Sequence, residues 1–124
     1  MAVQRIKDQF NGVATTTDAT VTTLASFTLT ANGSYHVYGT VLARNTSTGV
    51  IGSTLMFYGS FKRVAGTTTS VSLPAITLAA NEVGAWAVVT PVVIDNSGDV
   101  IRIRITGVVA TTIDWLADFT VLMN

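Results

Sequence analysis

The strongest constraint on the fold comes from the segment Ile101–Leu122, which reads IRIRITGVVATTIDWLADFTVL. Apolar and polar residues alternate in both halves, and residues two apart in a strand point to the same face of a sheet. The pattern therefore predicts two antiparallel strands, each with one buried face and one polar face. The polar face of the first strand carries Arg102 and Arg104, and that of the second carries Asp114 and Asp118.

These four charges have a structural interpretation. If the intervening GVVATT is a hairpin loop, the two arginines lie opposite the two aspartates. Opposite charges across neighbouring strands stabilise a sheet by roughly 0.2–1 kcal/mol per pair. A slip of one residue would bury all four, so we expect them to set the register of the closing hairpin. A binding site made by the same four residues is the alternative.

Short runs of β-branched and aromatic residues, separated by Gly, Asn and Ser, fill the rest of the chain. This spacing predicts a single all-β domain, an antiparallel β-sandwich of about eight strands, with a jelly roll as the favoured topology. Residues 1–12 are expected to form an N-terminal arm and residues 13–124 the sandwich. Asn32–Gly33 is a favoured hairpin turn. Pro74 and Pro91 are expected at edge strands or bulges, because proline cannot donate to a sheet ladder.

Charge and hydropathy indicate that much of the surface meets other protein. Only 11% of the 124 residues are charged, against roughly 25% in an average soluble domain, and the formal net charge is zero. The mean hydropathy is +0.51, whereas a soluble monomer usually keeps a charged surface. The sequence has no run of about 18 apolar residues and no apolar leader, and this argues against a membrane protein. Basic residues are too few and too balanced for nucleic acid.

Several predicted strands are apolar on both faces. In one of them Leu55, Phe57 and Phe61 share one face, while Met56 and Tyr58 share the other. Exposed apolar area on that scale usually marks a partner. A homo-oligomer is the simplest explanation, since a closed ring covers the same patch on every copy. The pattern alone does not decide which face is core and which is interface.

No catalytic arrangement is predicted, so we expect the protein not to be an enzyme and to need no cofactor. The single histidine, His36, lies within a strand pattern and is expected to be a packed or surface side chain. No Ser or Thr lies in a nucleophile motif such as G-x-S-x-G. Asp114 and Asp118 would be about 13 Å apart along a strand, beyond the roughly 5–9.5 Å of a glycosidase pair.

The best candidate for a metal site is the sequence DNSGD at Asp95–Asp99. It places carboxylates at positions 1 and 5 of a calcium loop. However, Val100 and Thr106 occupy positions 6 and 12, where that loop requires Gly and Glu. A plain turn between strands is favoured, because each of these residue types has a local backbone reason to be in a turn. No metal site is predicted.

Three segments resemble a β-sandwich module of tailed-bacteriophage virion proteins: Thr15–Leu29, Tyr58–Thr68 and Arg102–Leu122. Such modules occur in tail fibres and tailspikes, in head fibres and in small capsid decoration (cement) proteins. The resemblance covers roughly Val13 to Met123 and supplies no catalytic residues. Because only about twelve residues precede the module, the resemblance favours a free-standing decoration protein over a tail fibre.

The resemblance implies a structural protein on the capsid exterior of a virion, synthesised in the cytoplasm of the host bacterium. Such a protein would bind the major capsid protein, bridge capsid subunits and associate with itself, usually as a homotrimer. The expected capsid-contacting residues are Val3, Gln4, Arg5, Ile6, Lys7, Asp8, Gln9 and Phe10. A simply packed first strand is the alternative for this segment.

The alternative function is a receptor- or glycan-binding module of the tail-fibre or tailspike type. Sugar binding typically uses an exposed aromatic ring with polar neighbours. The aromatic candidates are Tyr35, Tyr38, Tyr58, Trp86 and Trp115. Both tryptophans alternate with core residues and are expected to be internal. A small non-viral lectin-like or adhesion domain is a third interpretation.

Overall fold

The computed structural model describes residues 6–46, 51–72, 75–81 and 91–124. Nine strands lie within these residues: β1 (Ile6–Thr16), β2 (Val21–Thr28), β3 (Gly33–Asn45), β4 (Ile51–Val64), β5 (Thr67–Ser70), β6 (Ala75–Asn81), β7 (Val92–Ser97), β8 (Val100–Thr106) and β9 (Ile113–Met123). None of the described residues form a helix of the length and apolarity needed to span a bilayer.

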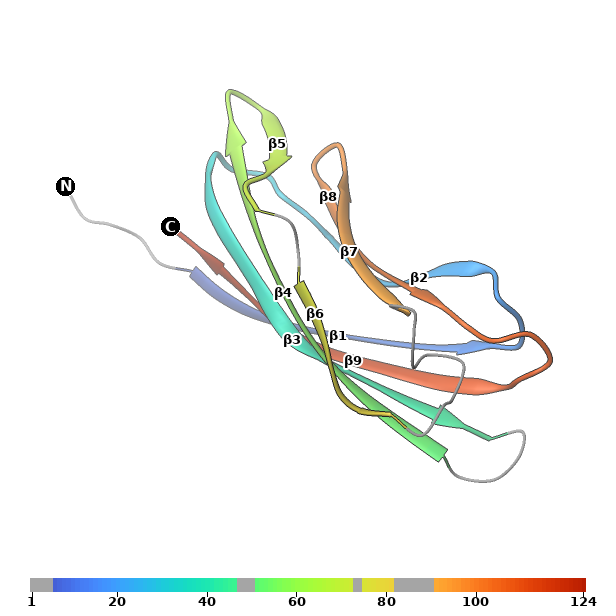
Figure 1. Cartoon of the computed structure of the whole chain (residues 1–124). Coiled ribbons are helices and arrows are strands. Elements are labelled where there is room, and N and C mark those ends of the chain that lie inside the picture. The colour runs from blue at the N-terminus through green and yellow to red at the C-terminus, as the bar shows by residue number, and fades with distance from the viewer. Residues whose placement is uncertain (1–5, 47–50, 73–74, 82–90) are drawn as a thin grey trace.

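The strands form two layers (Figure 1). The large sheet has the order β1-β9-β3-β4-β5, and β6 pairs with β4 beside β5. The small sheet has the order β2-β8-β7. Every pairing is antiparallel. The predicted all-β sandwich is confirmed.

The two ends of the chain nest within each other. β1 pairs with β9 in the large sheet, and β2 pairs with β8 in the small sheet. This nesting is what a jelly roll requires, whereas the β3–β4 hairpin keeps both of its strands in the large sheet. As expected for a residue that marks an edge, Pro91 directly precedes β7 at an edge of the small sheet. Pro74 lies outside the described residues.

The predicted closing hairpin is wrong, because β8 and β9 lie in different sheets. The segment between them, GVVATT, crosses from the small sheet to the large one (Figure 1). Gly107 begins this crossing in a tight space: a Cβ there would lie 2.4 Å from the carbonyl oxygen of Asp18. Asn32–Gly33 likewise joins β2 to β3 across the layers and forms no hairpin. Two strands facing each other across a core alternate like two neighbours in one sheet, so periodicity cannot tell these cases apart.

The core lies between the inner faces of the two sheets. The large sheet contributes Leu55, Phe61 and Phe119, and the small sheet contributes Ile101 and Ile103, each at most 1% exposed. An aromatic stack bridges the layers. The ring centroid of Phe10 on β1 lies 5.4 Å from that of Phe27 on β2 and 5.3 Å from that of Phe119 on β9. Burial of such rings supplies a large share of the apolar free energy of folding.

The boundary predicted at residue 12, between the N-terminal arm and the sandwich, falls inside strand β1. β1 pairs with β9 without interruption, from Ile6 opposite Met123 to Thr16 opposite Ile113. Residues 6–12 therefore belong to the sandwich, and residues 1–5 lie outside the described residues. The sequence left a packed strand as the alternative for this segment, because most outer residues of β1 are polar and its inner face includes Gly12.

Candidate functional site: the outer face of the large sheet

Large apolar side chains are exposed on the outer face of the large sheet, and seven of them lie along the β1, β3, β4 and β9 pairings. We call them the outer apolar patch: Val13 on β1, Tyr38 and Leu42 on β3, Met56 and Tyr58 on β4, and Leu116 and Leu122 on β9. Their exposure ranges from 37% for Tyr38 to 77% for Val13. The predicted alternation is confirmed here, because the intervening residues of β3, β4 and β9 form the core.

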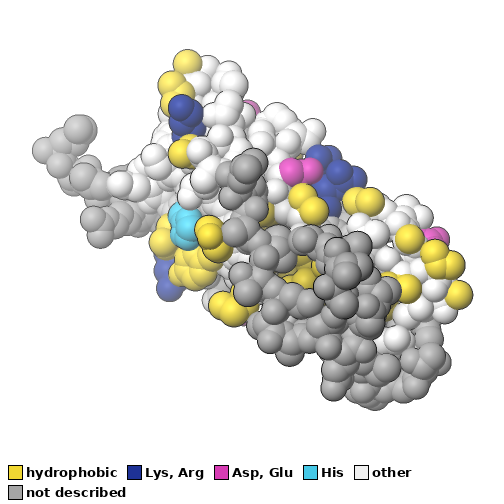
Figure 2. Space-filling model, in the orientation of Figure 1, with side chains coloured by type: hydrophobic (Ala, Val, Ile, Leu, Met, Phe, Trp, Pro, Cys, Tyr) yellow, Lys and Arg dark blue, Asp and Glu magenta, His cyan; other side chains and the backbone are white. Residues whose placement is uncertain are grey.

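Strand register makes the patch continuous. Val13 is opposite Leu116, which is opposite Leu42 on its other side. Tyr38 is directly opposite Tyr58. Side chains directly opposite on one face are about 4.5–5.5 Å apart at Cβ, within contact distance. Figure 2 shows hydrophobic side chains gathered beside the histidine on this side of the molecule.

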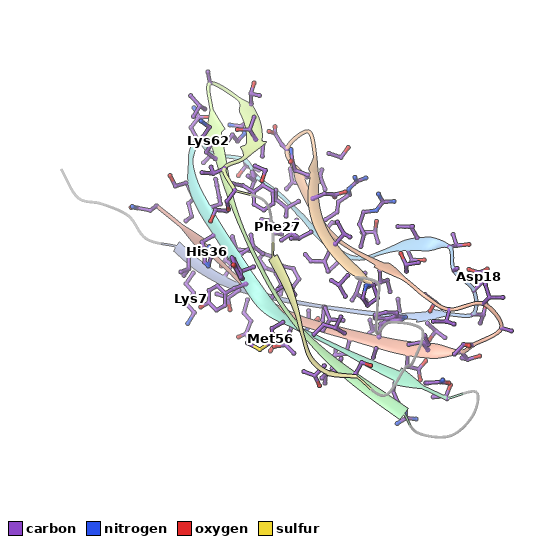
Figure 3. All side chains as sticks on the ribbon, in the orientation of Figure 1. Lys7, Asp18, Phe27, His36, Met56 and Lys62 are labelled. Carbon is purple, nitrogen blue, oxygen red and sulfur yellow. The ribbon has the colours of Figure 1, made fainter. Side chains whose placement is uncertain are left out.

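Three rings form one end of the patch. The His36 ring centroid lies 5.5 Å from that of Tyr38 and 6.4 Å from that of Tyr58. Nδ1 of His36 lies 3.2 Å from Oγ of Ser60. Figure 3 shows His36 and Met56 on the side of the large sheet that faces away from the small one. A hollow of about 480 Å³ is lined by residues that include these rings, Thr40 and Met56.

A second hollow, also of about 480 Å³, lies at the other end of the patch and is lined by residues that include Leu42, Arg44, Asp114 and Leu116. Both hollows are mostly apolar with a few polar groups at their margins. Such surfaces favour the burial of an apolar partner over acid–base chemistry. Within the described residues, no group of three or more His, Asp or Glu side chains could hold a metal ion.

The aspartates of β9 lie on the same outer face as the patch, but they do not meet the arginines of β8. Nε2 of Gln9 donates to Asp118 over 3.0 Å, and Oγ1 of Thr15 donates to Asp114 over 2.8 Å. Both donors come from β1. The predicted pairing of Arg102 and Arg104 with these aspartates is therefore wrong, because the two pairs of charges lie on opposite outer faces of the sandwich.

The two arginines instead bind Asp95 on the outer face of the small sheet. Nε and Nη2 of Arg102 donate to the Asp95 carboxylate over 2.8 and 2.9 Å, and Nη1 of Arg104 lies 3.8 Å from it. Asp95 and Arg102 are direct partners in the β7–β8 register. These hydrogen bonds raise the pKa of Arg102. The two arginines do face an opposite charge across the strands, as expected, but that charge belongs to Asp95 and not to Asp114 or Asp118.

The remaining carboxylate of DNSGD is also engaged within the protein. Asp99 accepts a hydrogen bond of 2.7 Å from Oγ1 of Thr68, and Nε of Arg63 lies 3.3 Å from its Oδ1. These two partners hold the pKa of Asp99 below its ordinary value. Gly98 adopts φ of 57° in the turn that joins β7 to β8, so the segment is a turn, as favoured.

The predicted N-terminal contact segment divides into three parts. Val3, Gln4 and Arg5 lie outside the described residues, and Ile6 begins β1. The side chains exposed to solvent are those of Lys7, Asp8 and Gln9. Phe10 is half-buried and packs against the core: the outer face of β1 is formed by the odd-numbered residues, and Phe10 points inward to Phe27 and Phe119. Capsid contact by this segment stays a prediction.

The aromatic candidates for glycan binding divide into buried and exposed rings. Tyr35 and Trp115 are buried, and Nε1 of Trp115 donates to Oγ1 of Thr16 over 2.9 Å. Trp86 lies outside the described residues. Tyr38 and Tyr58 are therefore the exposed rings among the candidates that the structure describes.

Comparisons with known proteins place few limits on this site. No protein-family model and no curated protein matches the chain. In structure, the chain is similar to part of the tailspike protein of Acinetobacter baumannii phage AM24, with a TM-score of 0.42 and 12% sequence identity. The match covers 93% of this chain and 26% of the tailspike chain, so it spans about a quarter of that protein.

Proposed function

We propose that the protein is a structural component of a tailed-bacteriophage virion, and that it works by burying the outer apolar patch against other protein. The observation that supports this role is the patch itself. Monomeric soluble proteins rarely expose contiguous apolar patches larger than a few hundred Å². The resemblance of three sequence segments to phage virion modules directs the proposal to the virion.

Within that role, capsid decoration is the first candidate. The protein would sit on the capsid exterior, bind the major capsid protein and bridge its subunits, with copies of the chain associating as a homotrimer. Apolar burial contributes roughly 25 cal/mol per Å², and the ordering of the partners offsets much of it. Repeated over many positions on a shell, even a modest contact would resist expansion of the head. The proposed role requires no reaction and no cofactor.

The structure changes how the capsid contact should be tested. Removal of the first ten residues would take Phe10 out of the aromatic stack and half of β1 out of the large sheet. A loss of capsid affinity after that truncation would therefore reflect unfolding as well as contact. Substitutions at exposed positions of β1, such as Lys7 and Gln9, keep the strand and are the better probes.

The test is to locate the protein on particles. Antibodies raised against the purified chain would be used for immunogold electron microscopy of phage particles whose genome encodes it. Label on the heads is expected. Label on the tails would move the tail-module alternative ahead, and particles that carry no label would overturn the structural role. Excess purified chain, which should abolish the label, is the control.

A second candidate, a glycan-binding module of the tail-fibre or tailspike type, has one observation in its favour. Tyr38 and Tyr58 expose two rings beside a hollow of about 480 Å³ whose lining includes Thr40. Rings of this kind can stack on the apolar face of a sugar while their hydroxyl groups form hydrogen bonds. This candidate requires that Tyr58→Ala abolish adsorption to host cells, whereas Val21→Ala on the small sheet should not.

A further inference from the structure

We propose that the outer apolar patch is the surface through which a second copy of this chain binds, large sheet against large sheet. The inference rests on the proposed function only in taking this patch as the working surface. It specifies which of the two outer faces is the interface and which partner covers it.

The area of the patch fits a stable protein interface. Seven side chains exposed by 37–77%, at about 150–250 Å² per fully accessible large side chain, present on the order of 600 Å² of apolar surface. A standard interface buries about 800 Å² on each partner, and about 56–65% of that area is apolar. The patch therefore supplies the whole apolar part of such an interface without contribution from other surfaces.

The arrangement of residue types also fits an interface. Tyr and Met, which are enriched at interfaces, supply three of the seven side chains of the patch, namely Tyr38, Tyr58 and Met56. Lys7 lies at one end of the patch and Arg44 at the other, and Asp118 lies between them, opposite Thr40. Tyrosine is among the residue types that contribute most to the binding free energy once an interface buries them.

A second copy is the partner that this surface fits most directly. A twisted sheet with an apolar outer face packs face to face on another such sheet at about 10 Å. The chain itself carries such a face, and packing between copies covers the patch on each of them. With a formal net charge of zero, two copies do not repel each other at long range.

The primary experiment measures solution mass by light scattering behind size exclusion, from about 1 to about 100 μM loaded protein. The wild-type chain should show at least about twice its 13.0 kDa mass. Leu42→Lys and Met56→Lys place a charge in the patch and should each weaken association by roughly 100-fold or more. Val21→Lys is the matched control, because Val21 is 49% exposed on the outer face of the small sheet, close to the 46% and 54% of the two test positions.

A second measurement covers the case in which a lysine variant does not fold. The chain has no cysteine, so Thr40→Cys creates a unique thiol at the centre of the patch. Its labelling by a maleimide should be slow in the assembled protein and should accelerate on dilution. Ser26→Cys, on the exposed outer face of the small sheet, should label rapidly at every concentration.

The outcomes separate this inference from the proposed function. A wild-type monomer at about 100 μM, or lysine variants that keep the oligomeric mass, would overturn binding of a second copy. Immunogold label on particles would still support the virion role in that case, with a different protein covering the patch. Conversely, an oligomer that leaves phage particles unlabelled would support this inference and overturn the virion role.

Discussion

The outer faces of the two sheets differ in kind although both point away from the core. The outer face of the small sheet carries an ion-paired cluster of Arg102, Arg104 and Asp95 with threonine and serine beside it. The outer face of the large sheet carries seven large apolar side chains. Both faces follow the same alternation along their strands, so secondary structure does not account for the difference.

The small sheet shows that this chain can form a polar outer face that remains in contact with solvent. Among the described residues of the small sheet, the exposed large apolar side chains are those of Val21 and Val93, each 49% exposed. The charges on this face, those of Asp95, Arg102 and Arg104, are gathered in one ion-paired cluster. The charges on the outer face of the large sheet, which include Lys7, Arg44, Asp114 and Asp118, are dispersed along its strands. The difference is what we expect if one face stays in solvent and the other is covered in the assembled state.

The largest expected effect comes from the layer that both faces share. Phe119 is 1% exposed and contacts Phe10, Phe27 and Phe57. Phe119→Ala should lower the free energy of unfolding by about 3–5 kcal/mol, because it leaves a cavity between the sheets. Urea denaturation monitored by tryptophan fluorescence measures this loss. Leu116→Ala, on the outer face of the same strand, is the control.

The control variant tests the assignment of faces. Leu116 is 42% exposed, so Leu116→Ala should cost less than about 1 kcal/mol in the dissociated chain. Equal losses for Leu116→Ala and Phe119→Ala would mean that the inner and outer faces of β9 have been assigned incorrectly. The comparison between the two outer faces would then lose its basis.

The next largest loss of stability is expected from a substitution on the polar outer face of the small sheet. Asp95→Ala leaves Arg102 and Arg104 close together without their carboxylate. We expect a loss of about 1 kcal/mol, since the Asp95 side chain is 33% exposed and solvent screens such pairs. The loss should shrink when urea denaturation is repeated at high salt. Asp118→Ala, whose partner is the neutral Gln9, should show little dependence on salt, and an equally salt-dependent Asp118→Ala would contradict this account.

Much of this comparison was predictable from the sequence. Alternation in β3, β4 and β9 assigns Val37, Leu55 and Phe57 to one face and Tyr38 and Met56 to the other, and the structure places the first set in the core and the second outside. Side-chain periodicity is local information, and a strand that packs on a core must obey it wherever its neighbours lie. The sandwich class follows from the same local pattern.

What the sequence could not give was the assignment of strands to sheets. β8 and β9 alternate like a hairpin, and the spacing between them suits either a turn or a crossing. The true partners of Arg102 and Asp118, which are Asp95 and Gln9, follow only from that assignment. A packed first strand was only the alternative to an arm for a related reason: β1 packs Phe10 beside Gly12, and this short apolar pattern is too weak to outweigh the charges near it.

A smaller effect on stability is expected when the pH is lowered, through the carboxylate of Asp99. Asp99 in the turn of the small sheet bonds to Thr68 and Arg63 of the large sheet. These contacts lower the pKa of Asp99 below its ordinary value of 3.8. The stability that this carboxylate contributes is therefore fully present above pH 3.8 and is lost as the pH falls through the lower folded-state pKa.

Asp99→Asn tests that linkage. The variant should be less stable than the wild type at neutral pH, and its stability should decline less steeply below pH 3.8. Thermal unfolding followed by circular dichroism across the acid range measures both effects. If the stability of the variant and that of the wild type decline in parallel as the pH falls, Asp99 does not link the sheets. Asp18, whose pKa is lowered by the backbone N–H of Thr20 in another turn, should continue to contribute in the variant.

The smallest change in intrinsic stability gives the sharpest test of the two outer faces. Met56→Ser and Val21→Ser remove exposed side chains from the large and small sheets, and each should alter the unfolding free energy of the dissociated chain by at most about 0.5 kcal/mol. The two variants should differ in how Tm depends on protein concentration, because an assembly that binds the folded state raises Tm by mass action. The wild type and Val21→Ser should show that rise, and Met56→Ser should lose most of it. If all three curves are flat, or all three rise alike, apolar exposure on the large sheet has no role in association, and the difference between the two faces must have another cause.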